Sequence, residues 1–440
     1  MSTPPVPIPF STPPWLQGLP SPYHTPSHRK WQAACQSFMA EHLHAHVLEW
    51  ENTGEIPSHV FRTFSEHNML IPALPAPLPI ELLKRNGIHD FLGVVTVDEF
   101  DYTHFAIYIS ELRASGLPGP ASALMAGVAY AVPPLIKYGS PQLQERFVPG
   151  FLRGEIRACI GITEPGAGSD VAGIATTAVK SEDGRFYVLN GAKKWITNGI
   201  WADYCTMAVR TGGPGPGGLS LLLVPLKNNP GVTVRRIKVG GGITGGTSYI
   251  DLDDVKVPVE NLIGREGEGM KMVMTNFNHE RLLIAIGVTR SARVALSSAF
   301  SYVMKREAFS KPLVDQPVVR HRLAKCGAEL ESLAAWVDQL VYQMGHLEKK
   351  VSDVELGGLT ALAKARAGMV FDKCARSAVL LFGGNGFTTT GQGEIVEKLS
   401  REVPGARIPG GSEDVLLDLA VRQLLKNYRA KVRALEAPKL

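Results

Sequence analysis

The stretch Ile162-Thr163-Glu164-Pro165-Gly166-Ala167-Gly168-Ser169-Asp170 is a polar, glycine-rich bend that leaves a strand-like segment. Further along, Trp195-Ile196-Thr197-Asn198 ends a second strand pattern that begins at Phe186 and passes an Asn190-Gly191 turn signal. Both segments are rich in turn residues, hydroxyls and backbone groups that no regular element uses. Together they indicate two loops that face one flat, polar ligand.

Composition and charge exclude several classes of protein. The chain has 440 residues, of which 45% are hydrophobic and 20% charged, and its formal net charge is +5. This is a globular composition, long enough for more than one core. The weak positive charge comes without a run of basic residues, so it gives no nucleic-acid footprint. No stretch reaches the roughly 18 apolar residues of a membrane span, so we expect none.

The cysteines and histidines favour a reduced protein without a metal. The cysteine number is odd, the positions are scattered and no C-x-x-C occurs, which favours buried thiols in an intracellular protein over disulfides or zinc. His42, His44 and His46 lack a further ligand pattern, so a solvated helix face is the preferred interpretation. The cysteines are Cys35, Cys159, Cys205, Cys326 and Cys374.

The two ends of the chain carry possible targeting information. Residues 1–27 are proline-rich and contain no Lys or Arg, which argues against a secretory signal and a mitochondrial transit peptide and predicts a disordered arm. The chain ends Pro438-Lys439-Leu440, a degenerate relative of the peroxisomal Ser-Lys-Leu signal. We therefore expect a cytoplasmic or peroxisomal protein.

Three regions follow the arm, and they predict an α+β fold. Helical patterns dominate residues 28–158, strand patterns residues 159–264, and long helical patterns residues 265–440. The glycine tract 212–218 lacks the Lys-Ser/Thr of a phosphate loop and predicts a hairpin loop. The expected strands are 186–189, 204–210, 219–225, 232–239 and 249–257, and the expected helices of the last region are 270–305, 318–347, 354–381 and 414–435.

Two further segments could carry chemistry. Glu280 lies near the start of a predicted helix, where the helix dipole favours a carboxylate in any case, and it could also act as a general base. Segment 408–414 places Gly410, Gly411 and Ser412 before a new helix, with free amides that can bind an anionic oxygen. A third segment, 381–387, is a glycine turn after a helix end, an ordinary helix C-cap.

Taken in order, these motifs resemble those of the acyl-CoA dehydrogenase family over residues 28–437. The family fold has an N-terminal helical domain, a middle β-barrel or sandwich domain and a C-terminal four-helix bundle. The matching motifs are Thr163-Glu164-Pro165-Gly166-Ala167-Gly168-Ser169-Asp170, Asn190-Gly191-Ala192-Lys193-Lys194-Trp195-Ile196-Thr197-Asn198-Gly199, Arg306-Glu307-Ala308-Phe309 and Gly383-Gly384-Asn385-Gly386-Phe387.

The resemblance implies bound FAD and an oligomer, a tetramer or a dimer. Trp195 would cover one flavin face, Thr197 would bond near flavin N5, and Arg306 and Phe309 would reach the cofactor of a neighbouring subunit. The implied FAD residues are Ile160, Ile162, Thr163, Gly168, Ser169, Trp195, Ile196, Thr197, Arg306, Phe309, Gln316, Gly383, Gly384 and Ser412; the implied substrate contacts are Ser169, Arg281 and Gly411.

The family places its catalytic base at one of two positions. One group has a Glu in the loop before the last helix, which falls here on Gly410. The other, with the isovaleryl- and long-chain-type enzymes, has it in a Glu-Arg-Leu context, matched here by Glu280-Arg281-Leu282. The resemblance therefore implies that Glu280 is the base and that the Gly410 amide binds the thioester oxygen.

Three positions depart from the family pattern. Gln316 sits one residue early, with Pro317 in the place expected for Gln; Leu380 replaces a Gln; and Glu402 replaces an Asp. The first two bear on the contacts with FAD from a neighbouring subunit.

The expected reaction is the α,β-dehydrogenation of an acyl-CoA, with electrons passed to an electron-transfer flavoprotein or to oxygen. The alternatives are an acyl-CoA oxidase and a non-catalytic protein on the same fold. Acyl length and branching stay open.

Overall fold

The computed structural model describes residues 6–436, so the Pro438-Lys439-Leu440 ending lies outside the described residues. The chain divides into two compact units, each assembled from separate stretches. Unit 1 takes residues up to 37, residues 101–117 and residues from 281 onward; unit 2 takes residues 38–100 and 118–280.

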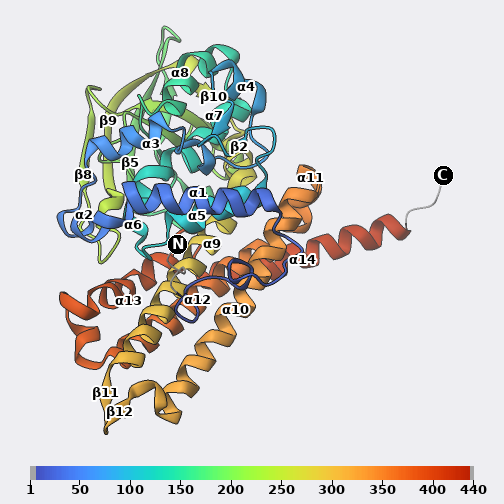
Figure 1. The fold of residues 1–440 in the computed structure, drawn as a ribbon. Coiled ribbons are helices and arrows are strands. Elements are labelled where there is room, and N and C mark those ends of the chain that lie inside the picture. Colours follow the sequence, from blue (N-terminus) through green and yellow to red (C-terminus); the bar gives the residue numbers. More distant parts are fainter. Residues whose placement is uncertain (1–5, 437–440) are drawn as a thin grey trace. The chain divides into compact units, whose positions relative to one another are not determined.

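Helices dominate both ends of the described chain, and most strands fall between residues 158 and 263 (Figure 1). The helices are α1 (Pro26–His42), α2 (Val47–Thr53), α3 (Ser58–Glu66), α4 (Ile80–Arg85), α5 (Tyr102–Leu112), α6 (Pro118–Ala126), α7 (Val132–Tyr138), α8 (Pro141–Leu152), α9 (Gly269–Lys305), α10 (Pro317–His346), α11 (Lys349–Glu355), α12 (Gly357–Phe382), α13 (Glu394–Arg407) and α14 (Glu413–Glu436). The strands are β1 (Asp90–Phe91), β2 (Val95–Thr96), β3 (Ala158–Gly161), β4 (Thr177–Lys180), β5 (Phe186–Ile196), β6 (Tyr204–Arg210), β7 (Leu219–Pro225), β8 (Val232–Arg236), β9 (Ser248–Pro258), β10 (Leu262–Ile263), β11 (Glu307–Ala308) and β12 (Lys311–Pro312).

Unit 2 is built around an eight-stranded sheet. Its order is β10-β7-β6-β4-β5-β9-β8, and β3 pairs with β6 in parallel. The central strands β6 and β7 are apolar on both faces and almost wholly buried, which is why their bounds follow directly from the apolar runs 204–210 and 219–225. The glycine tract 212–218 connects these two antiparallel strands as predicted.

The Asn190-Gly191 pair differs from its expectation. It is not a turn, because β5 continues through it to Ile196 along β9. The register shifts between Leu189 and Gly191, and Asn190 bonds the side chain and backbone of Asp254 at 2.9 Å each. The pair therefore forms a β-bulge, a second structure that Asn-Gly favours.

Unit 1 contains the long helices of the C-terminal region. Helix α12 packs against α10, α13 and α14, and α10 also packs against α5. Helix α9 runs for 37 residues without a break. Helix α13 is not predicted from the sequence, because Pro404 and Gly405 lie within it.

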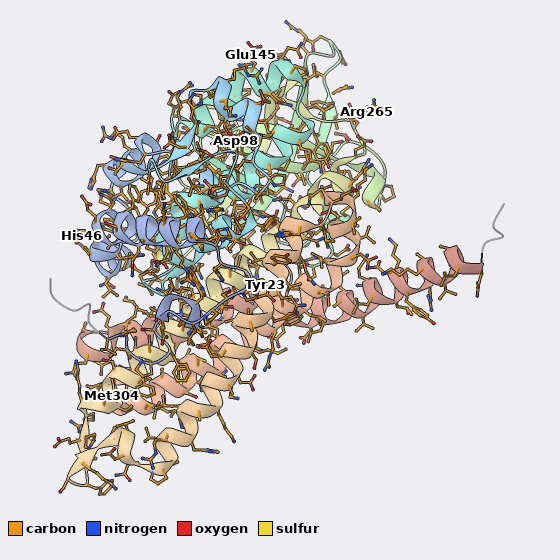
Figure 2. All side chains as sticks on the ribbon, turned by 45° about the vertical axis from the view of Figure 1, so that its right-hand side comes forward. Tyr23, His46, Asp98, Glu145, Arg265 and Met304 are labelled. Carbon is orange, nitrogen blue, oxygen red and sulfur yellow. The ribbon has the colours of Figure 1, made fainter. Side chains whose placement is uncertain are left out.

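The start of the chain does not form the expected disordered arm, at least from residue 6. Residues 14–17 form a short 3-10 helix in which Trp15 is buried. The ring of Tyr23, which is labelled in Figure 2, lies 5.4 Å from that of Tyr342. Arg290 and Arg293 donate to the carbonyls of Ser11 (3.0 Å) and Phe10 (3.1 Å). Proline removes amide donors but also restricts the unfolded chain, so a proline-rich segment can dock when other groups bind its carbonyls.

The cysteines and the apolar helices complete the description. All five cysteines are free and buried, as predicted. Two stretches, Pro118–Tyr138 and Gly269–Lys305, reach the length and mean hydropathy of a membrane span, which counting apolar runs did not reveal. Within the fold, 72% and 78% of these windows are buried, as in the core helices of a folded protein.

Candidate active site

The glycine-rich bend follows β3 and carries two unused backbone donors. Glu164 and Ala167 exchange backbone hydrogen bonds of 3.0 and 3.2 Å, which turns the chain sharply. Beyond this turn Gly168 and Ser169 are exposed, and within residues 6–436 their amides donate to no other group. Free amides in a tight bend form a site for anionic oxygen.

A buried ion pair holds this bend to the sheet. Lys193 donates to Glu164 at 2.7 Å and to the carbonyl of Ile162 at 3.2 Å. Glu164 also accepts the amides of Ala175 (2.7 Å) and Thr176 (3.0 Å). Burial alone would raise the pKa of Glu164, but the Lys193 charge and these bonds bring it below its ordinary value.

Trp195 occupies a second bulge, at the end of β5. The pairing with β9 shifts register between Lys193 and Ile196, and Trp195 has a φ of +59°. A positive φ is a strained conformation for a bulky residue, and such strain concentrates at functional sites. The bulge leaves Trp195 51% exposed, with the Lys194 ammonium 4.4 Å from its ring centre.

The residues after Trp195 are anchored inside unit 2. The Asn198 amide donates to Gly245 at 2.8 Å and its side chain to Ala123 at 3.2 Å. The Asn198 Oδ1 atom is buried without a partner among the described residues. Thr197, the residue before Asn198, is half-buried.

The other predicted flavin residues of unit 2 lie on or next to the two strands that carry these loops. Ile160 lies in β3, and Ile162 and Thr163 follow its end; all three are half-buried. Ile196 is buried and packs in the sheet core, so its backbone is the part that can face a ligand.

Glu280 lies on α9 and is held by a neighbour. Asn276, one turn earlier, donates to the Glu280 carboxylate at 2.9 Å and lies 3.4 Å from the Ala129 carbonyl. Glu280 is half-buried, whereas Arg281, where the last stretch of unit 1 begins, is buried. Sequence reasoning missed Asn276, although its i, i+4 spacing from Glu280 is a signal that could have found it.

The loop after α13 keeps free amides in unit 1. Gly410 and Gly411 have φ values of +70° and +99°, and their amides donate to no group of residues 6–436. A Cβ on Gly410 would lie 2.5 Å from Ile284 Cδ1. Ile284 is one turn after Glu280 on α9, so helical spacing puts both residues on one face of that helix.

The residues expected at a neighbouring subunit's cofactor gather on one hairpin. Strands β11 and β12 are joined by Phe309 and Ser310, both with positive φ, and Phe309 is 90% exposed. Arg306 is exposed just before β11. Gln316 precedes α10 and Pro317 is its first residue, a position where the missing amide costs no hydrogen bond.

The glycine turn after α12 is open to solvent. Gly383, with a φ of +60°, ends the helix, and neither Gly383 nor Gly384 has an atom within 4 Å of an added Cβ. Leu380, which stands in place of a family Gln, is 64% exposed. Ser412 begins the approach to α14, where its carbonyl accepts the Leu416 amide.

These residues fit the FAD that the resemblance implies. In unit 2 a flavin ring would find the exposed face of Trp195, and a pyrophosphate would find the amides of Gly168 and Ser169. The unpartnered Oδ1 of Asn198 marks a buried polar position at the same strand end. These donors and the flat apolar surface match the parts of such a cofactor.

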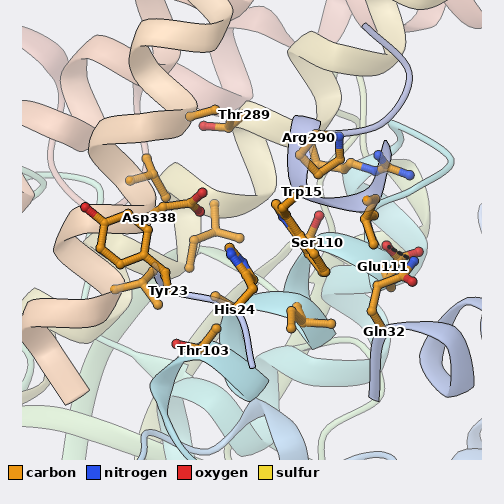
Figure 3. Close-up of a pocket in the computed structure, with 18 of the residues that line it drawn as sticks. Trp15, Tyr23, His24, Gln32, Thr103, Ser110, Glu111, Thr289, Arg290 and Asp338 are labelled. Atoms are coloured by element: carbon orange, nitrogen blue, oxygen red, sulfur yellow. Dashed lines mark hydrogen bonds between the residues drawn. The ribbon is translucent and has the colours of Figure 1, made fainter. Parts of the chain in front are cut away.

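A cavity of about 90 Å³ lies within unit 1 and is lined by residues other than those of the loops described above (Figure 3). Its polar walls include Asp338, Arg290 and Glu111, and Gln32 donates to Glu111 at 3.2 Å. Burial raises the pKa of Asp338 to about 7. The mixed charges favour ordered water over an anion or a cation.

A cluster of His28, Asp101 and His104 has the composition of a metal site, but its side-chain atoms already form hydrogen bonds within the protein. Asp101 caps α5, accepting the amides of Thr103 (2.8 Å) and His104 (2.9 Å). Burial raises the pKa of Asp101, but hydrogen bonds from both histidines outweigh this and bring it below its usual range. His28 Nδ1 accepts the Thr25 amide at 2.9 Å. The cluster is a helix cap that ties α1 to α5.

Three family profiles match the chain in order. They are the acyl-CoA dehydrogenase N-terminal domain over residues 25–155, the middle domain over residues 159–255 and the C-terminal domain over residues 267–425.

Individual proteins match almost end to end. The acyl-CoA dehydrogenase apdG of Emericella nidulans is 65% identical over 428 residues, covering 97% of this chain and 98% of that protein. The acyl-CoA dehydrogenase AFT10-1 of Alternaria alternata is 37% identical and covers 96% of both. A crystal structure of a probable acyl-CoA dehydrogenase from Mycobacterium abscessus has a TM-score of 0.80 at 31% identity, covering 91% of this chain and 100% of that one.

Proposed function

The chain belongs to the acyl-CoA dehydrogenase family and is an acyl-CoA dehydrogenase, and from this premise we propose that Glu280 is its catalytic base. The reaction removes a proton from the α carbon and a hydride from the β carbon of an acyl-CoA thioester. Family membership makes the enzyme FAD-dependent, and bound FAD accepts the hydride. The observation that carries the base assignment is the Asn276–Glu280 bond of 2.9 Å, which holds a half-buried carboxylate in one orientation.

The protein's own groups divide the work on the thioester. Glu280 takes the α proton, and Asn276 keeps its carboxylate from rotating away. The Gly410 amide, free of other partners within the described chain, donates to the thioester oxygen, where negative charge develops as the proton leaves. Arg281, Ser169 and Gly411 are the proposed substrate contacts.

In this proposal the loops of unit 2 supply the main contacts with FAD. Trp195 would cover one face of the flavin, Thr197 would bond near its reactive edge, and the amides of Gly168 and Ser169 would bind its pyrophosphate. The exposed tip at Phe309 supports a homo-oligomer, a tetramer or a dimer, because an aromatic side chain that is 90% exposed at the tip of a hairpin is suited to contact a neighbouring subunit.

Glu280→Gln tests the base. It keeps the size of the side chain and one acceptor for Asn276, so the protein should fold and stay yellow while flavin bleaching by acyl-CoA falls by at least about a thousandfold. The control is Glu145→Gln, an exposed glutamate on α8, which should bleach at the wild-type rate. Turnover of Glu280→Gln within tenfold of the wild type would refute the assignment.

The electron acceptor is part of the same proposal. We favour an electron-transfer flavoprotein over oxygen, with acyl-CoA oxidase activity as the alternative. Stopped-flow mixing of substrate-reduced enzyme with air-saturated buffer decides it: rapid reoxidation with stoichiometric peroxide would show an oxidase, whereas slow reoxidation together with dye reduction supports a dehydrogenase.

A further inference from the structure

Lys364 is a buried lysine placed directly behind the candidate amide donor. It lies on α12 and is only 1% exposed. Its ammonium donates to the carbonyl of Arg407 at 3.0 Å and to that of Gly411 at 2.8 Å. These two carbonyls lie on either side of Gly410 in the chain, so one side chain bonds the backbone before and after it.

We propose that Lys364 is the positioning residue of loop 408–412, and that its positive charge strengthens the Gly410 amide as the donor to the thioester oxygen. The inference rests on the proposed role of Gly410. It adds a group that no motif of the sequence analysis includes.

The loop needs an external clamp because its own backbone is loose. Gly410 and Gly411 both have positive φ, and glycine has more unfolded freedom to lose than any other residue. Ile284 closes the loop from the α9 side, and the Lys364 Cε lies 4.0 Å from the place of a Gly410 Cβ. The amide is thus held between an apolar contact and a charged one.

The charged groups around Lys364 decide how it titrates. Burial lowers the pKa of Lys364 to about 8, Glu413 on α14 acts to raise it, and Arg281 on α9 lowers it. Arg407 on α13 is engaged by Glu413 at 2.7 Å and by Asp372 of α12 at 2.9 Å, so its own charge is matched. Lys364 is therefore charged below about pH 8 and becomes neutral above it.

Loss of this charge has a defined consequence. A neutral amine still has two N–H groups and can keep both carbonyl bonds, so the loop stays in place. The positive charge behind Gly410 disappears, however, and with it part of the stabilisation of the developing anion. Turnover should fall as the pH rises through about 8, while KM changes little.

Lysine variants of the purified, flavin-loaded enzyme test this. Lys364→Arg keeps the charge at every pH, so its kcat should not fall between pH 7 and 9.5 as that of the wild type does. Lys364→Gln should lower kcat roughly 10- to 100-fold at pH 7 with KM within about threefold. The matched control is Lys373→Gln on the same helix, a more exposed lysine paired with Glu329 at 3.0 Å, which should behave as the wild type.

The substrate is whichever of isovaleryl-, butyryl- or octanoyl-CoA the wild type oxidises fastest. A wild-type alkaline fall that persists in Lys364→Arg, or a wild-type kcat in Lys364→Gln, would overturn the inference. Should Lys364→Gln not fold, the Lys364→Arg pH profile decides alone. Glu280→Gln measured in parallel separates the two proposals: if it is inactive and yellow while the lysine variants behave as the wild type, only the role of Lys364 fails.

Discussion

The buried pair of Lys193 and Glu164 should be strongly coupled, and Glu164→Gln should be among the most destabilising conservative changes in unit 2. The Lys193 ammonium is fully buried, and once the carboxylate is replaced by an amide only neutral oxygens can accept from it, those of Gln at position 164 and of the Ile162 carbonyl at 3.2 Å. Breaking a buried pair in this way costs about 3–5 kcal/mol. At roughly 2–4 °C per kcal/mol for a unit of this size, the midpoint of thermal unfolding should fall by about 6–20 °C.

Lys193→Met should cost less, about 1–3 kcal/mol, because Glu164 keeps the amides of Ala175 and Thr176 as donors. In the double variant neither charge is buried alone, so we expect a coupling energy of at least about 2 kcal/mol. The control is Lys84–Asp98, an exposed pair at 2.8 Å, where Asp98→Asn should cost under about 1 kcal/mol.

These energies are measured by urea unfolding, monitored by tryptophan fluorescence, of the wild type, the two single variants and the double variant. The amount of flavin that each protein retains after gel filtration reports on the state of the glycine-rich bend 162–170. The pKa of Glu164 in the folded protein lies below the ordinary value of a glutamate. The ionised carboxylate therefore stabilises the fold at any pH above the ordinary pKa, and this stabilisation is lost as the pH falls through the lowered pKa. Glu164→Gln should lack this acid loss. Additive single-variant energies, with a coupling below about 0.5 kcal/mol, would refute the reasoning.

Two more predictions concern unit 1. Gly327→Ala would put a Cβ 2.4 Å from the Phe10 ring, so it should lower the free energy of unfolding by about 1–3 kcal/mol. In a Phe10→Ala background the same change should instead stabilise α10 by up to about 1 kcal/mol, because Ala favours helix over Gly. Urea unfolding that shows no such reversal of sign would contradict the docking of Phe10. Burial raises the pKa of Asp338 to about 7. The destabilisation of the fold by Asp338 therefore grows as the pH rises from about 4 to 7 and reaches its full size above pH 7. Asp338→Asn should therefore be more stable than the wild type at pH 8, by at most about 4 kcal/mol, and by less if solvent reaches the carboxyl group. Near pH 4 the two proteins should be equally stable. The same difference in the free energy of unfolding at both pH values would count against this.

The sequence predicted those parts of the fold that depend on local pattern. Strands β6 and β7 follow from apolar runs with glycine between them, and α9 and α14 agree with their expected bounds to within one residue. The bulge at Asn190 and the helix through Pro404 were missed, because the same residues also favour turns and breaks. The docked segment around Trp15 was missed because its partners are two arginines far along the chain.

The same division holds for the site. Motifs identified the bend with Gly168, the exposed Trp195 and the loop at Gly410 as local structures. The sequence did not identify Lys193 and Lys364 as buried. A lysine is buried only where other parts of the fold supply acceptors for its ammonium, and no local sequence pattern reveals those acceptors. Asn276 differs, since its spacing from Glu280 was available in the sequence.

The docking of the first residues onto late helices has a consequence for synthesis. Phe10 packs against Gly327, which is made 317 positions later (327 − 10). At about 5–20 residues per second, the segment leaves the ribosome and waits roughly 15–60 s before its partner exists. During that interval its apolar side chains, including Trp15, are accessible to chaperones and proteases. The first segment to be synthesised is therefore among the last to pack into the folded protein.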